Sequence, residues 1–159
     1  MKFDLQLFAV IALPDNPSAV VATAGKDYTL YLNTGTVILP EWVKIGGQRN
    51  SPLKQKADTI DVSNKSTGGY KATLAGVKSW DISLDGLALI DDPGCDALEY
   101  AYDNSKQVNI KLERPDKKYK TGWASVTEFS LDTDYSKEAT ISGSLQGIGA
   151  ISVWTVPAA

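Results

Sequence analysis

The chain has 159 residues, of which 43% are hydrophobic and 22% charged, and it carries a formal net charge of -3. This length is enough for one domain with its own core, and the composition excludes wholesale disorder. The acidic balance argues against a protein that grips nucleic acid by neutralising phosphates. There is no histidine, and Cys95 is the one cysteine. The chain therefore cannot form an internal disulfide, and it lacks the commonest general base of enzymes.

The first 24 residues are predicted to form an N-terminal arm, because Pro14 and Pro17 interrupt them and no strand or helix period is visible. A signal peptide is the alternative, with a cleavage site at the small residues 22–24. Asp4 and Gln6 break the apolar stretch that such a peptide needs. Its uninterrupted part is also far too short to span a bilayer, so no membrane partner is expected.

From Gly25 onwards, short β-prone runs alternate with Gly, Asn, Asp and Pro, which is typical of a mainly β domain. Strands are predicted, in chain order, at residues 27–33, 41–45, 76–89, 107–113, 119–133, 138–147 and 151–156. In the strand at 119–133, the alternation predicts Trp123 and Phe129 on the apolar side. Residues 48–75 are polar and rich in turn formers, which predicts either a functional loop or an extended, solvated hairpin.

One α-helix is predicted, at about residues 93–104. Asp91 and Asp92 can cap its N-terminus, and Pro93 suits the first helical position. The apolar residues that recur at helical spacing are Cys95, Leu98, Ala101 and Tyr102. This pattern favours a helix cap over an enzymatic acid pair for the two aspartates, and a core position over a nucleophile for Cys95.

Period-two alternation also gives the strands a polar face of small hydroxyls, amides and carboxylates. Its members in two of the strands are Ser79, Asp81, Ser83, Asp85, Thr140, Ser142, Ser144 and Gln146. A hydrated, weakly anionic face suits the wall of a water-filled channel through which a polyanion slides without binding. It equally suits the solvated side of an ordinary antiparallel sheet, and the residues alone leave both interpretations open.

Several segments resemble, in order along the chain, the major tail proteins (tail tube proteins) of long-tailed siphophages. These segments are residues 22–35, 42–49, 57–63, 74–86 and 127–131, and the third and fourth include ADTIDVS and LAGVKSWDISLDG. The resemblance spans roughly residues 22 to 150. Residues 1–9 depart from the family pattern.

The resemblance implies a mainly β fold, a tail-tube-like β-sandwich or barrel with one flanking helix and a long polar loop. The domain would occupy residues 25–156, between the arm at 1–24 and a C-terminal tail at 157–159. It implies a virion structural protein and not an enzyme, whose hexameric rings stack into the hollow tail tube. Other copies of the chain would be its main partner, with the tape measure protein and tail-end proteins as further partners. Phage DNA would pass through without specific binding, and assembly would take place in the bacterial host cytoplasm.

The residues of the polar face are accordingly assigned to the lumen. The polar stretch is expected to reach the neighbouring ring, through Gln48, Arg49, Lys54, Lys56, Asp58 and Asp61. No catalytic, cofactor-binding or metal-binding residue is predicted. The pairs Asp58 with Asp61 and Asp132 with Asp134 lack the repeated acidic positions of a calcium loop.

The main alternative is a monomeric carbohydrate- or ligand-binding β-sandwich that uses exposed tryptophans as a platform. Trp42, Trp80, Trp123 and Trp154 are available, although the alternation predicts that Trp80 and Trp123 are buried. A carboxylate-pair hydrolase is a more distant alternative, and no catalytic spacing supports it. A secretion-system tube protein would share the architecture of the first interpretation.

Overall fold

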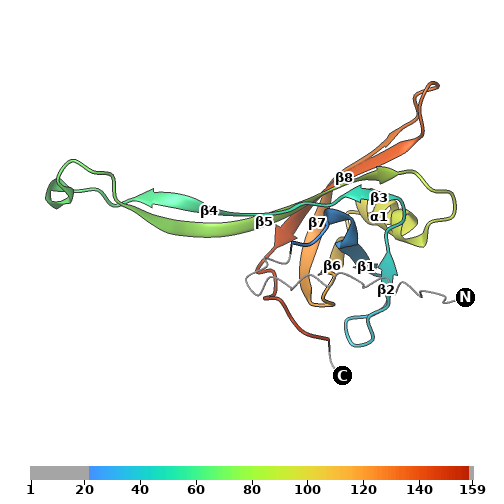
Figure 1. Ribbon diagram of the computed structural model, residues 1–159, viewed down its shortest axis with the longest axis horizontal. Coiled ribbons are helices and arrows are strands. Elements are labelled where there is room, and N and C mark those ends of the chain that lie inside the picture. Colours follow the sequence, from blue (N-terminus) through green and yellow to red (C-terminus); the bar gives the residue numbers. More distant parts are fainter. Residues whose placement is uncertain (1–21, 158–159) are drawn as a thin grey trace, which may run out of the picture.

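The structure is a computed structural model that describes residues 22–157. It consists of one curled antiparallel sheet with a single α-helix against it and a long two-stranded arm that projects from it (Figure 1). The strands are β1 (Thr29–Asn33), β2 (Trp42–Lys44), β3 (Gln48–Asn50), β4 (Leu53–Asp61), β5 (Thr73–Leu87), β6 (Gln107–Glu113), β7 (Tyr119–Asp132) and β8 (Thr140–Ile148). The helices are α1 (Pro93–Asp103) and two 3-10 turns, η1 (Gly25–Asp27) and η2 (Lys65–Thr67). The mainly β fold with one flanking helix is thus confirmed.

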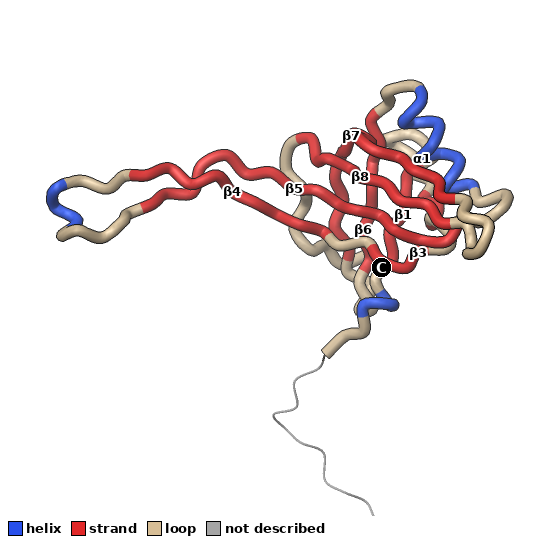
Figure 2. Tube along the Cα trace, turned by 90° about the horizontal axis from the view of Figure 1, so that it is seen from above, coloured by secondary structure: helices blue, strands red, loops and turns tan. Residues whose placement is uncertain are grey.

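The strand order across the sheet is β2-β1-β6-β7-β8-β5-β3, and β4 pairs with the first part of β5. The arm is the β4–β5 hairpin, and it extends in the opposite direction from the β7–β8 hairpin (Figures 1 and 2). Residues 53–75 of the polar stretch therefore belong to an extended hairpin and not to an irregular loop, whereas Gln48–Asn50 form β3. The N-terminal arm expected at 1–24, apart from its last three residues, and the end of the tail lie outside the described residues.

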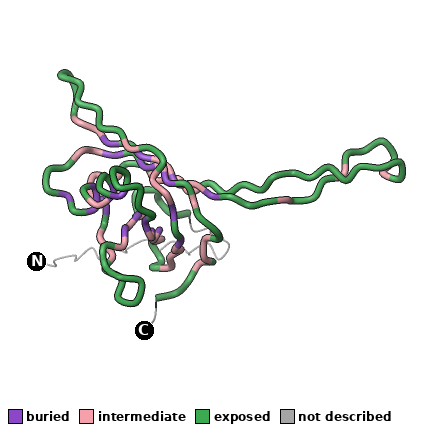
Figure 3. The backbone as a smooth tube through the Cα atoms, turned by 180° about the vertical axis from the view of Figure 1, so that it is seen from behind, coloured by how far each residue is buried: buried purple, intermediate pink, exposed green. Residues whose placement is uncertain are grey.

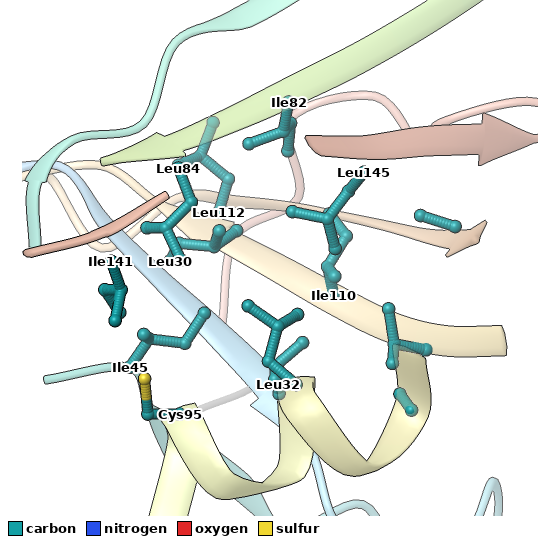
Figure 4. Packing of buried hydrophobic residues seen from close by; sticks show 14 of the residues in the cluster. Leu30, Leu32, Ile45, Ile82, Leu84, Cys95, Ile110, Leu112, Ile141 and Leu145 are labelled. Atoms are coloured by element: carbon teal, nitrogen blue, oxygen red, sulfur yellow. The ribbon is translucent and has the colours of Figure 1, made fainter. Parts of the chain in front are cut away.

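The hydrophobic core lies between the concave side of the sheet and α1 (Figure 4). Its largest fully buried side chains are Leu30, Leu32, Ile45, Ile82, Leu84, Leu98, Ile110 and Leu145. They come from β1, β5, β6, β8, α1 and the turn after β2, so one cluster ties both ends of the sheet to the helix. Burial raises the pKa of the Cys95 thiol in this core to about 11, as expected for a packing residue.

Asp92 anchors the start of α1. Its carboxylate accepts hydrogen bonds from the Gly94 N–H at 3.2 Å and from the Gly46 N–H at 2.7 Å. The first is the N-cap bond that the sequence predicts, and the second joins the helix to the turn between β2 and β3. Asp91 is not a second cap but takes a left-handed backbone conformation with φ 57°.

Gln48 closes the curled sheet where β3 approaches β1. Its side-chain Oε1 accepts from the Leu30 N–H at 3.0 Å, and its Nε2 donates to the Leu30 carbonyl at 2.7 Å. Nε2 also donates to the Ile45 carbonyl. The side-chain amide thus replaces the backbone pairing that a closed barrel would have at this position.

Trp80 sits at the root of the arm, 3% exposed, and donates its indole N–H to the Gly149 carbonyl at 2.9 Å. Its ring lies directly on the backbone of Gly147 and close to that of Gly122. A side chain at Gly147 would overlap the indole, so glycine is required there by close approach. The prediction that Trp80 is buried is confirmed.

The prediction that Trp123 is buried is wrong. The ladder between β7 and β8 shifts register between Val126 and Glu128. Thr127 is the extra residue of this bulge, so odd-numbered residues point outwards before it and even-numbered residues point outwards after it. Trp123 therefore shares the outward face with Glu128 and is 39% exposed, while Ala124 is buried.

The strand predicted at 151–156 is also wrong, since only a single bridge joins Thr155 to Tyr119. The segment runs along the first residues of β7, but there the Thr121 N–H donates to the Ser152 hydroxyl at 2.8 Å. A side chain thus takes the place of a backbone acceptor, and the ladder does not continue. Within residues 22–157, no helix combines the length and apolar composition that crossing a membrane would require.

Replacing Gln48 by Met should lower the free energy of unfolding of the monomer by at least about 2 kcal/mol. Met has a similar shape, but it leaves the Leu30 N–H and the Ile45 carbonyl without their partners, at about 1–3 kcal/mol for each buried group. The Leu30 carbonyl keeps its bond from the Ile45 N–H. Urea unfolding followed by tryptophan fluorescence measures this loss. The matched control is Gln107→Met, at an exposed position on β6, which should stay within about 0.5 kcal/mol of the native protein. Equal effects of the two changes would contradict the role assigned to Gln48.

Candidate functional site: a polar sheet face and a projecting arm

The ladder between β5 and β8 brings the two predicted polar rows together on one face of the sheet. The facing pairs are Asp81 with Gln146, Ser83 with Ser144, and Asp85 with Ser142. Thr140 continues the row at the end of β8. Ser79 does not join it in the same way, because it lies at the root of the arm opposite Lys56 of β4.

Strand β7 extends this face on the other side of β8. The facing pairs are Ser125 with Gln146, Glu128 with Ser144, Ser130 with Ser142, and Asp132 with Thr140. We refer to the outward polar side chains in the paired stretches of these three strands as the polar face: Asp81, Ser83, Asp85, Ser125, Glu128, Ser130, Asp132, Thr140, Ser142, Ser144 and Gln146. The bulge at Thr127, whose hydroxyl donates to the Ser144 carbonyl at 3.1 Å, keeps Glu128 and Asp132 on this side.

The polar face carries four carboxylates, Asp81, Asp85, Glu128 and Asp132, and no lysine or arginine. Basic side chains appear only at its border, where Lys54 and Lys56 of β4 lie opposite Asp81 and Ser79. Hydroxyl, amide and carboxylate groups of modest size make such a surface hydrated and repellent to other anions.

The other half of the outward side, over β6, β1 and β2, is covered by a cluster of aromatic side chains around Lys111. The Lys111 ammonium lies 4.5 Å from the ring centre of Tyr31, 5.3 Å from that of Trp42 and 5.7 Å from that of Tyr119. It also pairs with Glu113 at 3.4 Å. This ammonium is held by three rings and a carboxylate and is not available to a ligand.

The tryptophans do not form an open platform for sugars. Trp80 is buried, Trp42 is covered by Lys111, and the Trp154 ring lies under Arg114 at 4.8 Å and Lys120 at 5.3 Å. Trp123 is the one tryptophan among the described residues that is classed as exposed. The arrangement gives no support to a carbohydrate-binding surface.

The projecting arm carries Lys54, Lys56, Asp58 and Asp61, all of them exposed. It also exposes aliphatic and aromatic side chains that the sequence did not single out. These are Ile60, Val62, Tyr70, Leu74 and Val77, between 39% and 82% exposed (Figure 3). A two-stranded ribbon with no layer packed against it is marginally stable in water, so these side chains mark it as a surface for contact with another molecule.

Within the arm, Ile60 of β4 stands opposite Leu74 of β5. They are 52% and 58% exposed, and a register shift between Ala57 and Thr59 sets this pairing. The tip is ordered by polar bonds: Asn64 Oδ1 accepts from the Ser66 N–H at 2.8 Å, and hydrogen bonds from Ser63 lower the pKa of Asp61.

Gln48 and Arg49 do not lie on the arm. The Gln48 side chain is hydrogen-bonded to the backbone of Leu30 and Ile45. Arg49 binds Glu138, in the loop between β7 and β8, at 2.8 Å, and this hydrogen bond holds the pKa of the Glu138 carboxyl below its usual value. Of the residues predicted for contact with a neighbouring ring, the structure thus places four on the arm and two at the sheet edge.

The loop from β1 to β2 holds a further exposed apolar group that sequence reasoning missed. Val37, Ile38 and Leu39 are 71%, 89% and 78% exposed. The loop is nevertheless ordered, because the Asn33 side chain accepts from the N–H groups of Gly35 and Glu41. The sequence signal for this exposed group is the run of three aliphatic residues directly before Pro40.

No metal site is present in the part of the chain that the structure describes, where no three His, Cys, Asp or Glu side chains come close enough to bind an ion. Asp134 instead accepts hydrogen bonds from the Ser136 N–H and hydroxyl, which lower its pKa. This is a local turn, as is usual for an aspartate two residues before a serine.

Comparison with known proteins points to a structural protein and not to an enzyme. A family model described as phage tail tube protein matches residues 22–153. No protein with a curated description matches the chain by sequence. Among solved structures, the chain is similar to a subunit in the tail of an empty gene transfer agent particle determined with C6 symmetry. The identity is 26% and the TM-score 0.74, over 85% of this chain and 100% of that one.

Two more distant structures share the fold. The SPP1 tail tube is 17% identical with a TM-score of 0.71, over 86% of this chain and 81% of that one. A chain in the baseplate of the anti-feeding prophage is 12% identical with a TM-score of 0.64, over 84% of this chain and 95% of that one.

Proposed function

The chain belongs to the phage tail tube protein family, and from this premise we propose that six copies form a ring and that the rings stack into a hollow tail tube. The polar face is the observation that carries the proposal, because adjacent stretches of three strands present carboxylates and small polar groups without a basic residue. The outward Trp123–Ile148 pair lies beyond the end of these stretches. The C6 symmetry of the similar gene transfer agent tail supports the number six.

In this proposal the polar face lines the bore. DNA carries one negative charge per phosphate and binds proteins chiefly through lysine and arginine. Four carboxylates in each subunit repel it, and the intervening hydroxyls keep a layer of water between wall and DNA. Phage DNA then passes without specific binding. The helix α1, which packs against the opposite side of the sheet, faces outwards.

The arm, in turn, reaches the neighbouring ring. Its exposed apolar side chains lose their contact with water when a second copy covers them, at about 25 cal/mol for each Å² buried. This stabilises the stack and at the same time supports a ribbon that has no packing layer of its own. Asp58 and Asp61, farther out on the same hairpin, supply polar contacts to that ring.

The tube belongs to the virion tail and is assembled in the host cytoplasm in this proposal. The tape measure protein occupies the bore before DNA does, and tail-end proteins cover the rings at the two ends, where no further copy is available. These partners follow from the family.

A cysteine at Ser142 tests whether the polar face lines the bore. In Ser142→Cys tubes, a maleimide that carries a large polyethylene glycol chain should label the thiol far more slowly than in the monomer, whereas a small maleimide should label both. The reason is that a bulky reagent enters a long tube only from its ends. Labelling is read from gel mobility, and the native protein, whose Cys95 is buried, gives the blank.

The matched control is Glu99→Cys, on the exposed side of α1. It should react with the large reagent equally fast in monomer and tube. If Ser142→Cys behaves in the same way as Glu99→Cys, the polar face lies outside the tube and the assignment of the lumen fails.

Polar substitutions on the arm test its role in stacking. Ile60→Asn together with Leu74→Asn should leave the free energy of unfolding of the monomer within about 0.5 kcal/mol, because both side chains are already more than half exposed. Long tubes should be lost, with single rings or monomers in their place, as seen by electron microscopy. Lys71→Asn, a change from one exposed polar residue to another at the tip of the same arm, leaves the apolar side chains in place and should keep normal tubes. Tubes of native length from the double variant would remove the arm from the stacking contact.

A further inference from the structure

Two borders of the polar face have unpaired backbone in the described residues. On one border, β6 accompanies β7 only as far as the pair Gln107–Ser125, so β7 from Thr127 to Asp132 has a ladder only with β8. On the other border, β3 and β4 have backbone pairing only with β5, and on their outer side the Gln48 side chain alone reaches β1. Exposed edges of this kind are templates for another strand.

The two borders lie at the same height along the strands. Asn50 faces Asp85, Asp85 faces Ser142, and Ser142 faces Ser130, so one line across the sheet joins β3 to the free part of β7. The strand directions at the two borders also match. Strands β5 and β7 both run antiparallel to β8, and β3 runs antiparallel to β5, so β3 is antiparallel to β7. A second copy placed beside the first would continue the antiparallel sheet.

The charges at the two borders are complementary. The β7 border carries Glu128 and Asp132 on the polar face. The other border carries Arg49, Lys54 and Lys56, and the two lysines point to the polar face because they stand opposite Asp81 and Ser79. Arg49 already pairs with Glu138, but neither lysine has an ion pair among the described residues.

We propose that the seam between subunits of a ring joins the outer edge of β3 and the start of β4, residues 49–56, to residues 127–132 of β7 in a second copy, with Lys54 and Lys56 set against Glu128 and Asp132. The contact is head-to-tail, since two different edges meet, and repetition around an axis closes it into a ring. This inference rests on the proposed function and specifies which strands carry it.

The competing edge is β2, at the far end of the sheet. It offers three residues, Trp42–Lys44, and Trp42 is held in the Lys111 cluster. Strand β2 carries Lys44 and no carboxylate, so its charge does not complement the basic border of β3 and β4. The β7 edge is longer and opposite in charge.

Disulfide mapping tests the seam. Ser130→Cys is combined in turn with Asn50→Cys, Lys54→Cys or Lys56→Cys, all at exposed positions, and assembled rings are oxidised. Within one chain, Ser130 and Asn50 are three strand spacings apart, about 14 Å, which no disulfide spans. A ladder of covalent oligomers on a non-reducing gel therefore reports a contact between copies. One of the three combinations, set by the stagger of the ring, should produce it.

Lys44→Cys with Lys54→Cys is the control for the competing edge and should stay uncrosslinked. Crosslinking of this control, or closed rings in which all three Ser130 combinations fail to crosslink, would overturn the seam while leaving the proposed function intact. Failure of the native protein to form any closed oligomer would instead count against the proposed function itself.

A charge exchange gives an independent readout. Glu128→Lys with Asp132→Lys places like charges across the seam and should abolish rings in electron micrographs. Adding Lys54→Glu and Lys56→Glu should restore them, because opposite charges then face each other again. Unfolding curves of the monomers show whether each variant is folded. Native ring formation by the first variant, or absence of rescue in a folded second variant, would contradict the proposal.

Discussion

The antiparallel ladder between β5 and β8 is the constraint on which the rest of the structure depends. Because side chains alternate along a strand, one register places Ile82, Leu84 and Leu145 in the core and the polar face on the other side. A slip of one residue would exchange the two sets. The close fit of Trp80 over Gly147 and the closure of the curled sheet by Gln48 both require the same alignment.

The subunit leaves several features that a monomer would have to hide. It exposes a two-stranded arm with apolar side chains, an ordered loop with three aliphatic residues, and free edges on both borders of the polar face. In an isolated globular protein such features favour aggregation. In the tube that we propose, they are the surfaces through which copies complete one another.

Two small irregularities decide how these surfaces are presented. The bulge at Thr127 moves Glu128 and Asp132 onto the polar face, and the register shift after Ala57 pairs Ile60 with Leu74 on the arm. Without the first, the β7 border would lose its carboxylates, and the aromatic ring of Phe129 would face water. Single extra residues of this kind bend a strand and re-aim its side chains at little cost in backbone pairing.

The sequence by itself determined the β-rich class, a helix at about 93–104 capped at Asp91 and Asp92, and the alternation of β5, β6 and β8, because these depend on local period and local chemistry. The family was indicated by the resemblance of several segments in order along the chain. Only the tertiary structure decided that Trp123 faces outwards, that Gln48 bonds across the closing edge to Leu30, and that residues 151–156 form no strand. Each of these depends on a partner far away in the chain or on a bulge, and neither is visible in a pattern of alternating residues. The tertiary structure also brought Asp81, Gln146 and Ser125 into one row, since register between strands arises only when they pair.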